Sequence, residues 1–141
     1  MTPIETAKAC AQRMWSQDTA SQNLHMQLDL VEPGHSIMTM TVGKTMTNGY
    51  GICHGGYIFT LADSAFAYAC NTYNQVTVAQ HCNVTFLTPA LLGDRLTATA
   101  QERSRKGRSG LYDVTVTNQD GETIAEFRGN SRTTKGTILP E

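Results

Sequence analysis

The chain has 141 residues, of which 40% are hydrophobic and 16% charged, and its formal net charge is −1. This length suits one hydrophobic core, and the near-zero charge excludes the overall electrostatic attraction by which proteins bind nucleic acids or anionic membranes. No segment approaches the roughly 20 consecutive apolar residues that span a bilayer, and the N-terminus lacks the pattern of a secretory signal. We therefore expect one globular domain over residues 1–141, located in the cytoplasm, with no nucleic-acid or membrane partner.

The N-terminal third is predicted to hold a helix and a β-hairpin. Residues 4–15 have the spacing of a short amphipathic helix. Residues 24–31 and 36–42 alternate apolar and polar side chains around a Pro-Gly turn, which is typical of two antiparallel strands. Residues 44–53 have no such pattern, and we expect a loop there.

The next segment, from Gly55 to about Tyr73, is predicted to be a helix that is apolar nearly all round, so we expect it to be the buried core helix. It contains a single carboxylate, Asp63, which shares a helix face with Phe59 and Phe66. Taking a carboxylate out of water costs several kcal/mol unless it is paired or used. Asp63 is therefore the foremost candidate for a functional residue.

Four further strands are predicted at residues 77–87, 95–105, 110–118 and 123–131, because turn residues separate runs of strand-forming side chains. We expect these four strands to form an antiparallel meander. The predicted architecture is α+β, with a long antiparallel sheet packed on one central helix.

The start of the core helix has a composition that suits catalysis. Gly55 and Gly56 follow His54 and allow another molecule to approach the main chain closely. Free N–H groups at a helix N-terminus stabilise negative charge, for example on the oxygen of an acyl group under attack. This pattern indicates an oxyanion site at Gly55.

These residues form a recognisable combination. Asn48-Gly49, Cys53-His54-Gly55-Gly56 and Leu61-Ala62-Asp63 resemble the active-site signature of hotdog-fold acyl-CoA thioesterases, and Phe86-Leu87-Thr88-Pro89 resembles the strand that follows. Within that superfamily the chain is most similar to the phenylacetyl-CoA thioesterase branch of phenylacetate degradation. The resemblance implies a hotdog fold, hydrolysis of an acyl-CoA without a cofactor, and active sites shared across a dimer interface, usually in a tetramer. Two more segments carry it: Asp63 to Asn71, and Phe127-Arg128-Gly129.

Helix geometry independently points to an oligomer. Nine positions separate His54 from Asp63, so the two residues lie about 13.5 Å apart along a straight helix and roughly half a turn apart around it. They cannot act on one carbonyl within one subunit. A two-fold dimer would combine His54 and Gly55 of one chain with Asp63 of the other.

The proposed chemistry is thioester hydrolysis. Asp63 would act as general base on water or attack the carbonyl directly, and the sequence leaves both open. The Gly55 N–H would stabilise the oxyanion, while His54 and Asn48 hold and polarise the thioester. A thiol has a pKa near 8.5 and leaves readily, so one carboxylate can suffice.

Other residues are candidates for substrate binding. Gly56 is a candidate because it lets the substrate approach the main chain, and Tyr50, Phe59 and Phe66 could line an aromatic acyl pocket or instead fill the core. Coenzyme A phosphates could meet a basic cluster at the tip of the hairpin between residues 95 and 118, unless these cations are simply solvated. The cluster comprises Arg103, Arg105, Lys106 and Arg108.

Several alternatives remain. Cys53 beside His54 suggests a Cys-His nucleophile, but adjacent side chains generally point apart and the thiol suits packing better. The His and Cys residues lack metal-ligand spacing, so we expect no metal. Family members often carry Ser or Thr on the strand after the helix, where this chain has Ala79 and only Thr77 as a substitute. A non-catalytic acyl-CoA sensor, or a hydratase or dehydratase with His54 as base, are the competing functions.

Overall fold

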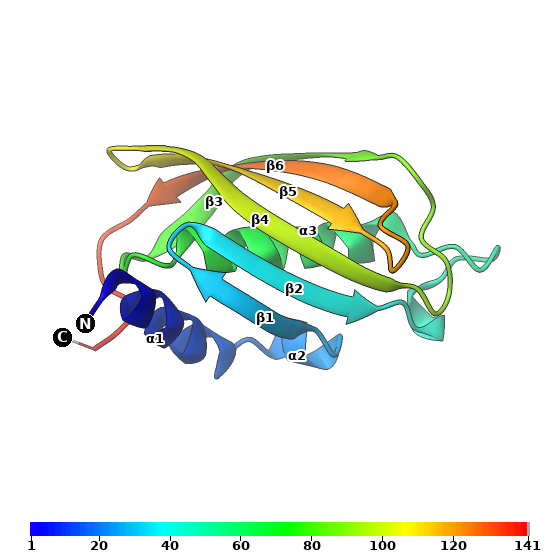
Figure 1. Ribbon diagram of the computed structural model, residues 1–141, viewed down its shortest axis with the longest axis horizontal. Helices are drawn as coiled ribbons and strands as arrows, with labels where there is room; N and C mark the ends of the chain where they lie inside the picture. The colour runs from blue at the N-terminus through cyan, green and yellow to red at the C-terminus, as the bar shows by residue number, and fades with distance from the viewer. Residues whose placement is uncertain (141) are drawn as a thin grey trace.

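A six-stranded antiparallel sheet curves around one long helix in the computed structural model, which describes residues 1–140 (Figure 1). This arrangement confirms the predicted α+β hotdog fold. The helices are α1 (Pro3–Trp15), α2 (Thr19–Asn23) and α3 (Gly55–Cys70), with a 3₁₀ turn at Lys44–Met46. The strands are β1 (Gln27–Glu32), β2 (His35–Thr41), β3 (Thr77–Phe86), β4 (Arg95–Lys106), β5 (Ser109–Thr117) and β6 (Thr123–Thr133).

The strand order is β1-β2-β4-β5-β6-β3. Strands β4, β5 and β6 form the expected meander, but the expectation that β3 precedes them in it is wrong, because β3 pairs with β6 at the sheet edge. The connection after β3 crosses back to the β2 side, where Cys53 N–H donates to Ala90 O and Gly93 N–H to Val42 O, both within 2.9 Å. These hydrogen bonds hold the connection in place so that β4 pairs with β2.

Helix α3 lies on the concave face of the sheet because small side chains let it approach closely. Leu61, Ala62 and Ala65 are fully buried, and a side chain on Gly129 of β6 would stand only 2.8 Å from the Phe66 ring. Ser36 of β2 donates a hydrogen bond to the Ala65 carbonyl at 2.6 Å. Packing of this kind fixes the helix rotation, and so the direction in which its polar side chains point.

The helix ends at Cys70, earlier than the predicted end near Tyr73. The Asn71 side chain stops it: Nδ2 donates to the Ala67 and Thr77 carbonyls and Oδ1 accepts from the Thr77 N–H, each at 2.9 Å. A buried amide that satisfies both segments draws the chain out of the helix and into β3.

The short helix α2 was not predicted. Asp18 caps it by accepting from the Ser21 N–H at 3.0 Å, and its second carboxylate oxygen accepts from the Tyr68 hydroxyl of α3 at 2.9 Å. Five residues are too few to show a helical period, so only the Asp cap could have signalled this element.

The two sheet edges differ. Helix α1 packs along β1 (Figure 1), whereas the outer edge of β3 is uncovered in one chain. Val78 and Phe86 of β3 are 48% and 51% exposed, and the strand pairs on one side only, with β6. A ten-residue open edge of this kind is a template for pairing with another strand. No helix within residues 1–140 has the length and hydropathy needed to cross a membrane.

Candidate active site

His54 caps the start of α3. Its ring Nδ1 accepts a hydrogen bond from the Gly56 N–H at 2.9 Å, and the main-chain N–H of His54 donates to Met46 O at 2.8 Å. A ring nitrogen that accepts from an N–H carries no proton, so the neutral imidazole holds its proton on Nε2. The exposed ring therefore offers a hydrogen-bond donor at Nε2.

The two glycines after His54 have different roles. The Gly56 N–H is occupied by His54, and a side chain on Gly56 would lie 3.0 Å from His54 Nδ1, so Gly56 serves the cap and does not offer its N–H to a ligand. The Gly55 N–H has no partner among residues 1–140. It is an unpaired donor at the positive end of the helix dipole.

Phe86, a residue that the sequence analysis did not single out for function, lies against Gly55. A side chain on Gly55 would come within 2.9 Å of Phe86 Cζ, although the ring is 51% exposed. The absence of a side chain at position 55 thus admits this ring to the helix N-terminus. The signal for it was weak, since an aromatic residue at a strand end normally signals packing alone.

Asp63 is half-buried on α3, and burial is the cause that raises the pKa of its carboxyl above the usual value. It forms no ion pair or hydrogen bond within residues 1–140. Burial and then the charge of Asp63 raise the pKa of the Cys82 thiol on β3. Asp63 therefore lies near Cys82 of β3, as a half-buried carboxylate without a partner within residues 1–140.

One chain does not close a pocket around these groups. Two cavities of about 470 and 730 Å³ lie beside Arg95 and between α1 and β1, and neither is lined by His54, Gly55 or Asp63. His54 and Asp63 sit at the start and in the middle of the same straight helix, as the sequence spacing predicted.

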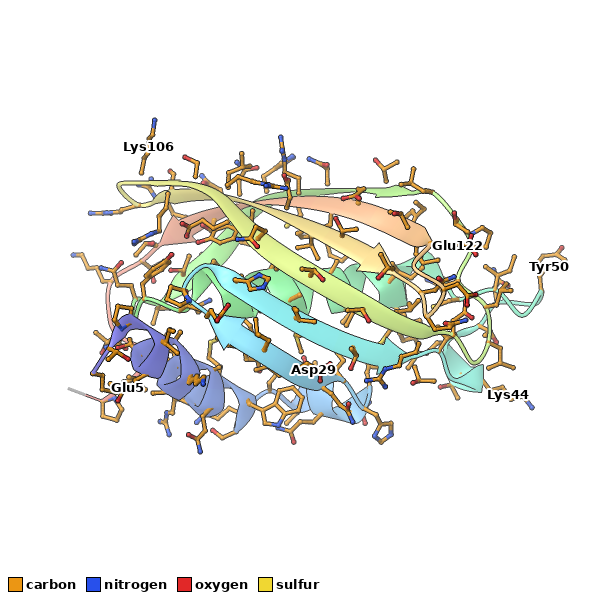
Figure 2. The ribbon with its side chains drawn as sticks, viewed as in Figure 1. Glu5, Asp29, Lys44, Tyr50, Lys106 and Glu122 are labelled. Atoms are coloured by element: carbon orange, nitrogen blue, oxygen red, sulfur yellow. The ribbon has the colours of Figure 1, made fainter. Side chains whose placement is uncertain are left out.

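The loop before α3 projects from the end of the molecule. Asn48 Oδ1 accepts from the Tyr50 N–H at 3.0 Å, and the Asn48 N–H donates to Ile52 O at 2.9 Å. The Asn48 side chain thus shapes its own turn and keeps only its amide donors for a ligand. Tyr50 is 87% exposed and lies at the tip of this loop (Figure 2).

The two phenylalanines of α3 pack against Phe127 of β6. The Phe59 ring is half-buried with its centroid 5.5 Å from that of Phe127, and Phe66 is buried between Phe127 and Tyr112. Phe66 therefore fills the core. Phe59 keeps part of its surface free on the side where Asp63 lies.

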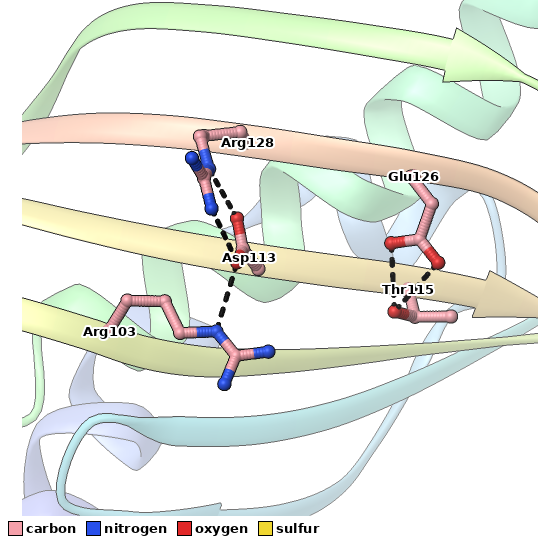
Figure 3. A network of polar contacts seen from close by, with 5 residues as sticks. All are labelled: Arg103, Asp113, Thr115, Glu126 and Arg128. Atoms are coloured by element: carbon pink, nitrogen blue, oxygen red, sulfur yellow. Dashed lines mark hydrogen bonds and ion pairs between the residues drawn. The ribbon is translucent and has the colours of Figure 1, made fainter.

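The basic hairpin tip lies at the opposite end of the chain from Tyr50, as the labelled Lys106 shows (Figure 2). Arg103 already forms an ion pair on the outer face of the sheet, where its Nε donates to Asp113 at 2.9 Å (Figure 3). Asp113 also accepts two hydrogen bonds from Arg128, which are the main cause of its lowered pKa. The first of the four tip cations is thus already paired.

Arg105 is committed as well. Its guanidinium lies 3.5 Å from the centroid of the Tyr73 ring, and its Nε lies 3.7 Å from Glu102 Oε1. Lys106 and Arg108 form no ion pair within residues 1–140. These two residues are the tip cations free to meet an anionic ligand.

The Cys53 thiol is poorly suited to act as the nucleophile. Burial raises the pKa of Cys53 to about 11, so its thiol is protonated at neutral pH and is a poor nucleophile.

The strand after the helix offers no free hydroxyl at the two positions considered above. Thr77 is buried and donates its hydroxyl proton to Gln75 O at 2.9 Å, while Ala79 is exposed on β3. Within residues 1–140 no three His, Cys, Asp or Glu side chains are arranged to hold a metal ion.

Comparisons with known proteins agree with this geometry. The sequence profile described as Thioesterase superfamily matches residues 50–125. The acyl-coenzyme A thioesterase PaaI of Escherichia coli K12 is 44% identical over 131 residues, which are 93% of this chain and 94% of that protein.

Solved structures are similar as well. The E. coli PaaI protein from the phenylacetic acid degradation operon superposes with a TM-score of 0.95 at 41% identity, over 96% of this chain and 99% of that one. A Streptococcus mutans UA159 protein bound to acetyl CoA has a TM-score of 0.76 at 29% identity, over 79% of this chain and 90% of that one.

The His54 cap predicts different outcomes for two substitutions. His54→Ala removes the acceptor for the Gly56 N–H and should lower the free energy of unfolding by about 1 kcal/mol. His54→Asn supplies another good cap and should change stability by less than about half of that. Urea titrations at fixed protein concentration measure both, and equal destabilisation by the two variants would contradict the cap.

The raised pKa of Asp63 should make the stability of the fold depend on pH. The pKa of Asp63 is higher in the folded chain than in the unfolded chain. Its contribution to the free energy of unfolding is therefore fully present below the pKa of the unfolded state, and it is lost as the pH rises through the pKa of the folded state. Asp63→Asn, which cannot ionise, should therefore melt about 1–3 °C above wild type at pH 7–8, with the difference shrinking toward pH 4. Calorimetry across this range tests it, with exposed Asp120→Asn as the control; a lower melting temperature at pH 8 would refute the desolvation argument.

Proposed function

The chain belongs to the thioesterase superfamily, and we propose that it is an acyl-CoA thioesterase that hydrolyses an arylacetyl-CoA such as phenylacetyl-CoA. The products are the free acid and coenzyme A. One observation carries the mechanism: the desolvated Asp63 has no partner within residues 1–140, while the Gly55 N–H is unpaired at a helix N-terminus.

Asp63 acts as the general base in this mechanism. It takes a proton from water as the water oxygen bonds to the thioester carbon, and the C–S bond then breaks to release coenzyme A as a thiolate, which takes up the proton. The raised pKa of Asp63 makes its carboxylate a stronger base at neutral pH. Direct attack by the same carboxylate would give an anhydride that water then hydrolyses, and the open geometry accommodates either route.

Two donors meet the developing oxyanion. The Gly55 N–H stabilises the negative oxygen, and removing one donor of this kind typically costs about 3 kcal/mol in the barrier. His54 Nε2–H is the second donor, since Nδ1 is occupied by Gly56. Asn48 lies on the loop before the helix and would steady the thioester with its free amide protons.

The complete site requires a second copy of the chain. Antiparallel pairing of two β3 strands around a two-fold axis extends the sheet and covers the exposed Val78 edge. It also brings two α3 helices side by side in opposite directions, so that the start of one lies near the middle of the other. Gly55 of one chain then faces Asp63 of its partner, and each dimer has two equivalent sites.

Larger assembly and location are parts of the same proposal. The outer face of the sheet carries half-buried threonines on β4 and β5 beside the Arg103–Asp113–Arg128 network, whose charges pair with one another (Figure 3). It suits packing of two dimers into a homotetramer. Four free cysteines favour a reducing cytoplasm.

The substrate class rests on the relatives and on two free cations. E. coli PaaI is named an acyl-coenzyme A thioesterase and comes from the phenylacetic acid degradation operon, and the S. mutans protein binds acetyl CoA. In the antiparallel dimer the hairpin tip of one chain lies toward the Tyr50 loop of the other. We assign the coenzyme A phosphates to Lys106 and Arg108, with Arg103 and Arg105 placed behind them by their own ion pairs.

The hydratase alternative conflicts with the His54 geometry. A base at Nε2 would need its proton on Nδ1, where it would oppose the Gly56 N–H at 2.9 Å. The sensor alternative differs in its product, since a sensor binds acyl-CoA without releasing thiol.

A free-thiol assay tests the function. Wild type should release thiol from phenylacetyl-CoA, and Asp63→Ala should reduce kcat by at least about 10³-fold while leaving assembly intact. The rate should fall as the pH drops through the raised pKa of Asp63, since only the carboxylate accepts a proton. Binding without thiol release from any acyl-CoA would favour the sensor, and near-normal kcat in Asp63→Ala would overturn the mechanism.

Mixed dimers test the shared site. Gly55→Pro removes the N–H donor, and the half-exposed Phe86 ring can swing away from the added ring. A hybrid of a Gly55→Pro chain and an Asp63→Ala chain has one doubly defective site and one intact site. An equimolar, freely exchanged mixture of the two inactive parents contains about half hybrids and should recover roughly a quarter of wild-type activity.

Subunit exchange has to be verified by mass spectrometry of tagged chains. Confirmed hybrids without recovered activity would mean that each chain contains its own complete site.

A further inference from the structure

The Phe86 ring is unusual among the exposed apolar side chains because it packs against Gly55, the residue that carries the proposed oxyanion donor. It ends β3, where it pairs with Ala125 of β6, and its Cζ, Cε1 and Cε2 would lie 2.9–3.4 Å from a side chain on Gly55. Half of its surface is nevertheless free. The tip of the ring therefore meets the helix N-terminus, and the rest of the side chain is available to contact a ligand.

Its surroundings are apolar. The loop after β3 hydrogen-bonds to the segment before α3 through Leu92 N–H to Gly51 O at 3.2 Å, and Leu87, Leu91 and Leu92 are each more than half exposed. An exposed apolar cluster of this kind at the entrance of a site marks contact with a ligand or partner. Within this cluster Phe86 is the member that contacts Gly55.

We propose that Phe86 is the specificity-determining wall of the acyl site and stacks on the aryl group of the substrate. This inference rests on the proposed function. When the thioester oxygen sits on the Gly55 N–H, the carbonyl carbon lies within a few ångströms of the Phe86 ring. An arylacetyl group carries its ring one methylene from that carbon, which is the reach that offset or edge-to-face contact with Phe86 requires. A straight acyl chain has no ring for such a contact.

The contact between Phe86 and Gly55 also explains why position 55 has no side chain. Any side chain at position 55 would push the Phe86 ring off the helix N-terminus, so Gly55 is needed for the acyl wall as well as for close approach of the thioester. Gly55→Ala should therefore reduce discrimination between aryl and straight-chain substrates, although it keeps the N–H donor.

The test compares phenylacetyl-CoA with hexanoyl-CoA in the free-thiol assay on the assembled protein. Phe86→Leu should lower the ratio of the two kcat/KM values by about 2- to 10-fold, through KM and kcat together, because an aromatic pair contributes about that much beyond buried area. Phe86→Tyr keeps the ring and should keep the ratio. Ile4→Ala, at a similarly exposed apolar position on α1 outside the proposed site, is the control and should also keep it.

A second measurement does not depend on turnover. In the Asp63→Asn background, calorimetric titration should show Phe86→Leu weakening binding of phenylacetyl-CoA more than that of hexanoyl-CoA by a similar factor. Circular dichroism melts confirm that each variant is folded. Equal effects of Phe86→Leu on both substrates, or an equal effect of Ile4→Ala, would overturn the assignment. Failure of wild type to release thiol from any acyl-CoA would instead overturn the proposed function and the assignment with it.

Discussion

The need to bury one helix almost completely, while leaving one carboxylate on it unpaired, governs this structure. Helix α3 packs its small residues into the concave sheet, and Asp63 stays half-buried near Cys82 of the edge strand β3. Had a further strand of the same chain covered that edge, the carboxylate would be fully buried at a cost of several kcal/mol. The open edge therefore limits the desolvation cost and at the same time prepares the site for a second chain.

Much of the fold was predictable because it depends on local patterns. Alternation predicted the first two strands and turn residues between strand-forming runs predicted the other four, all within three residues at either end, and the Ala-rich apolar run predicted the core helix. The position of β3 was not predictable in this way. Its sequence reads like a central strand, and hydrophobic alternation carries no information on which neighbour a strand pairs with. That choice depends on hydrogen bonds between the 87–94 connection and segments more than 35 residues earlier in the chain.

The candidate site was predictable to a similar extent. His54, Gly55 and Asp63 stood out because a cap, a glycine and a lone carboxylate are unusual on an apolar helix, and such signals are visible in one segment. The roles of Gly56, Arg103 and Arg105 were not visible, because each is decided by a partner: His54 Nδ1, Asp113 and the Tyr73 ring. A sequence shows that a cation is present, but whether the cation is free depends on contacts made across the fold.

The His54 cap links folding to chemistry. By accepting from the Gly56 N–H, Nδ1 satisfies one donor of the helix start, leaves the Gly55 N–H unpaired, and holds the remaining ring proton on Nε2. One hydrogen bond thus sets the helix start, the vacant main-chain donor and the tautomer of the side chain beside it. The half-exposed Phe86 ring adds an apolar wall to the same point, so that a polar pair of donors faces an aromatic surface. That combination suits a substrate whose polar thioester and apolar ring are separated by a single methylene group.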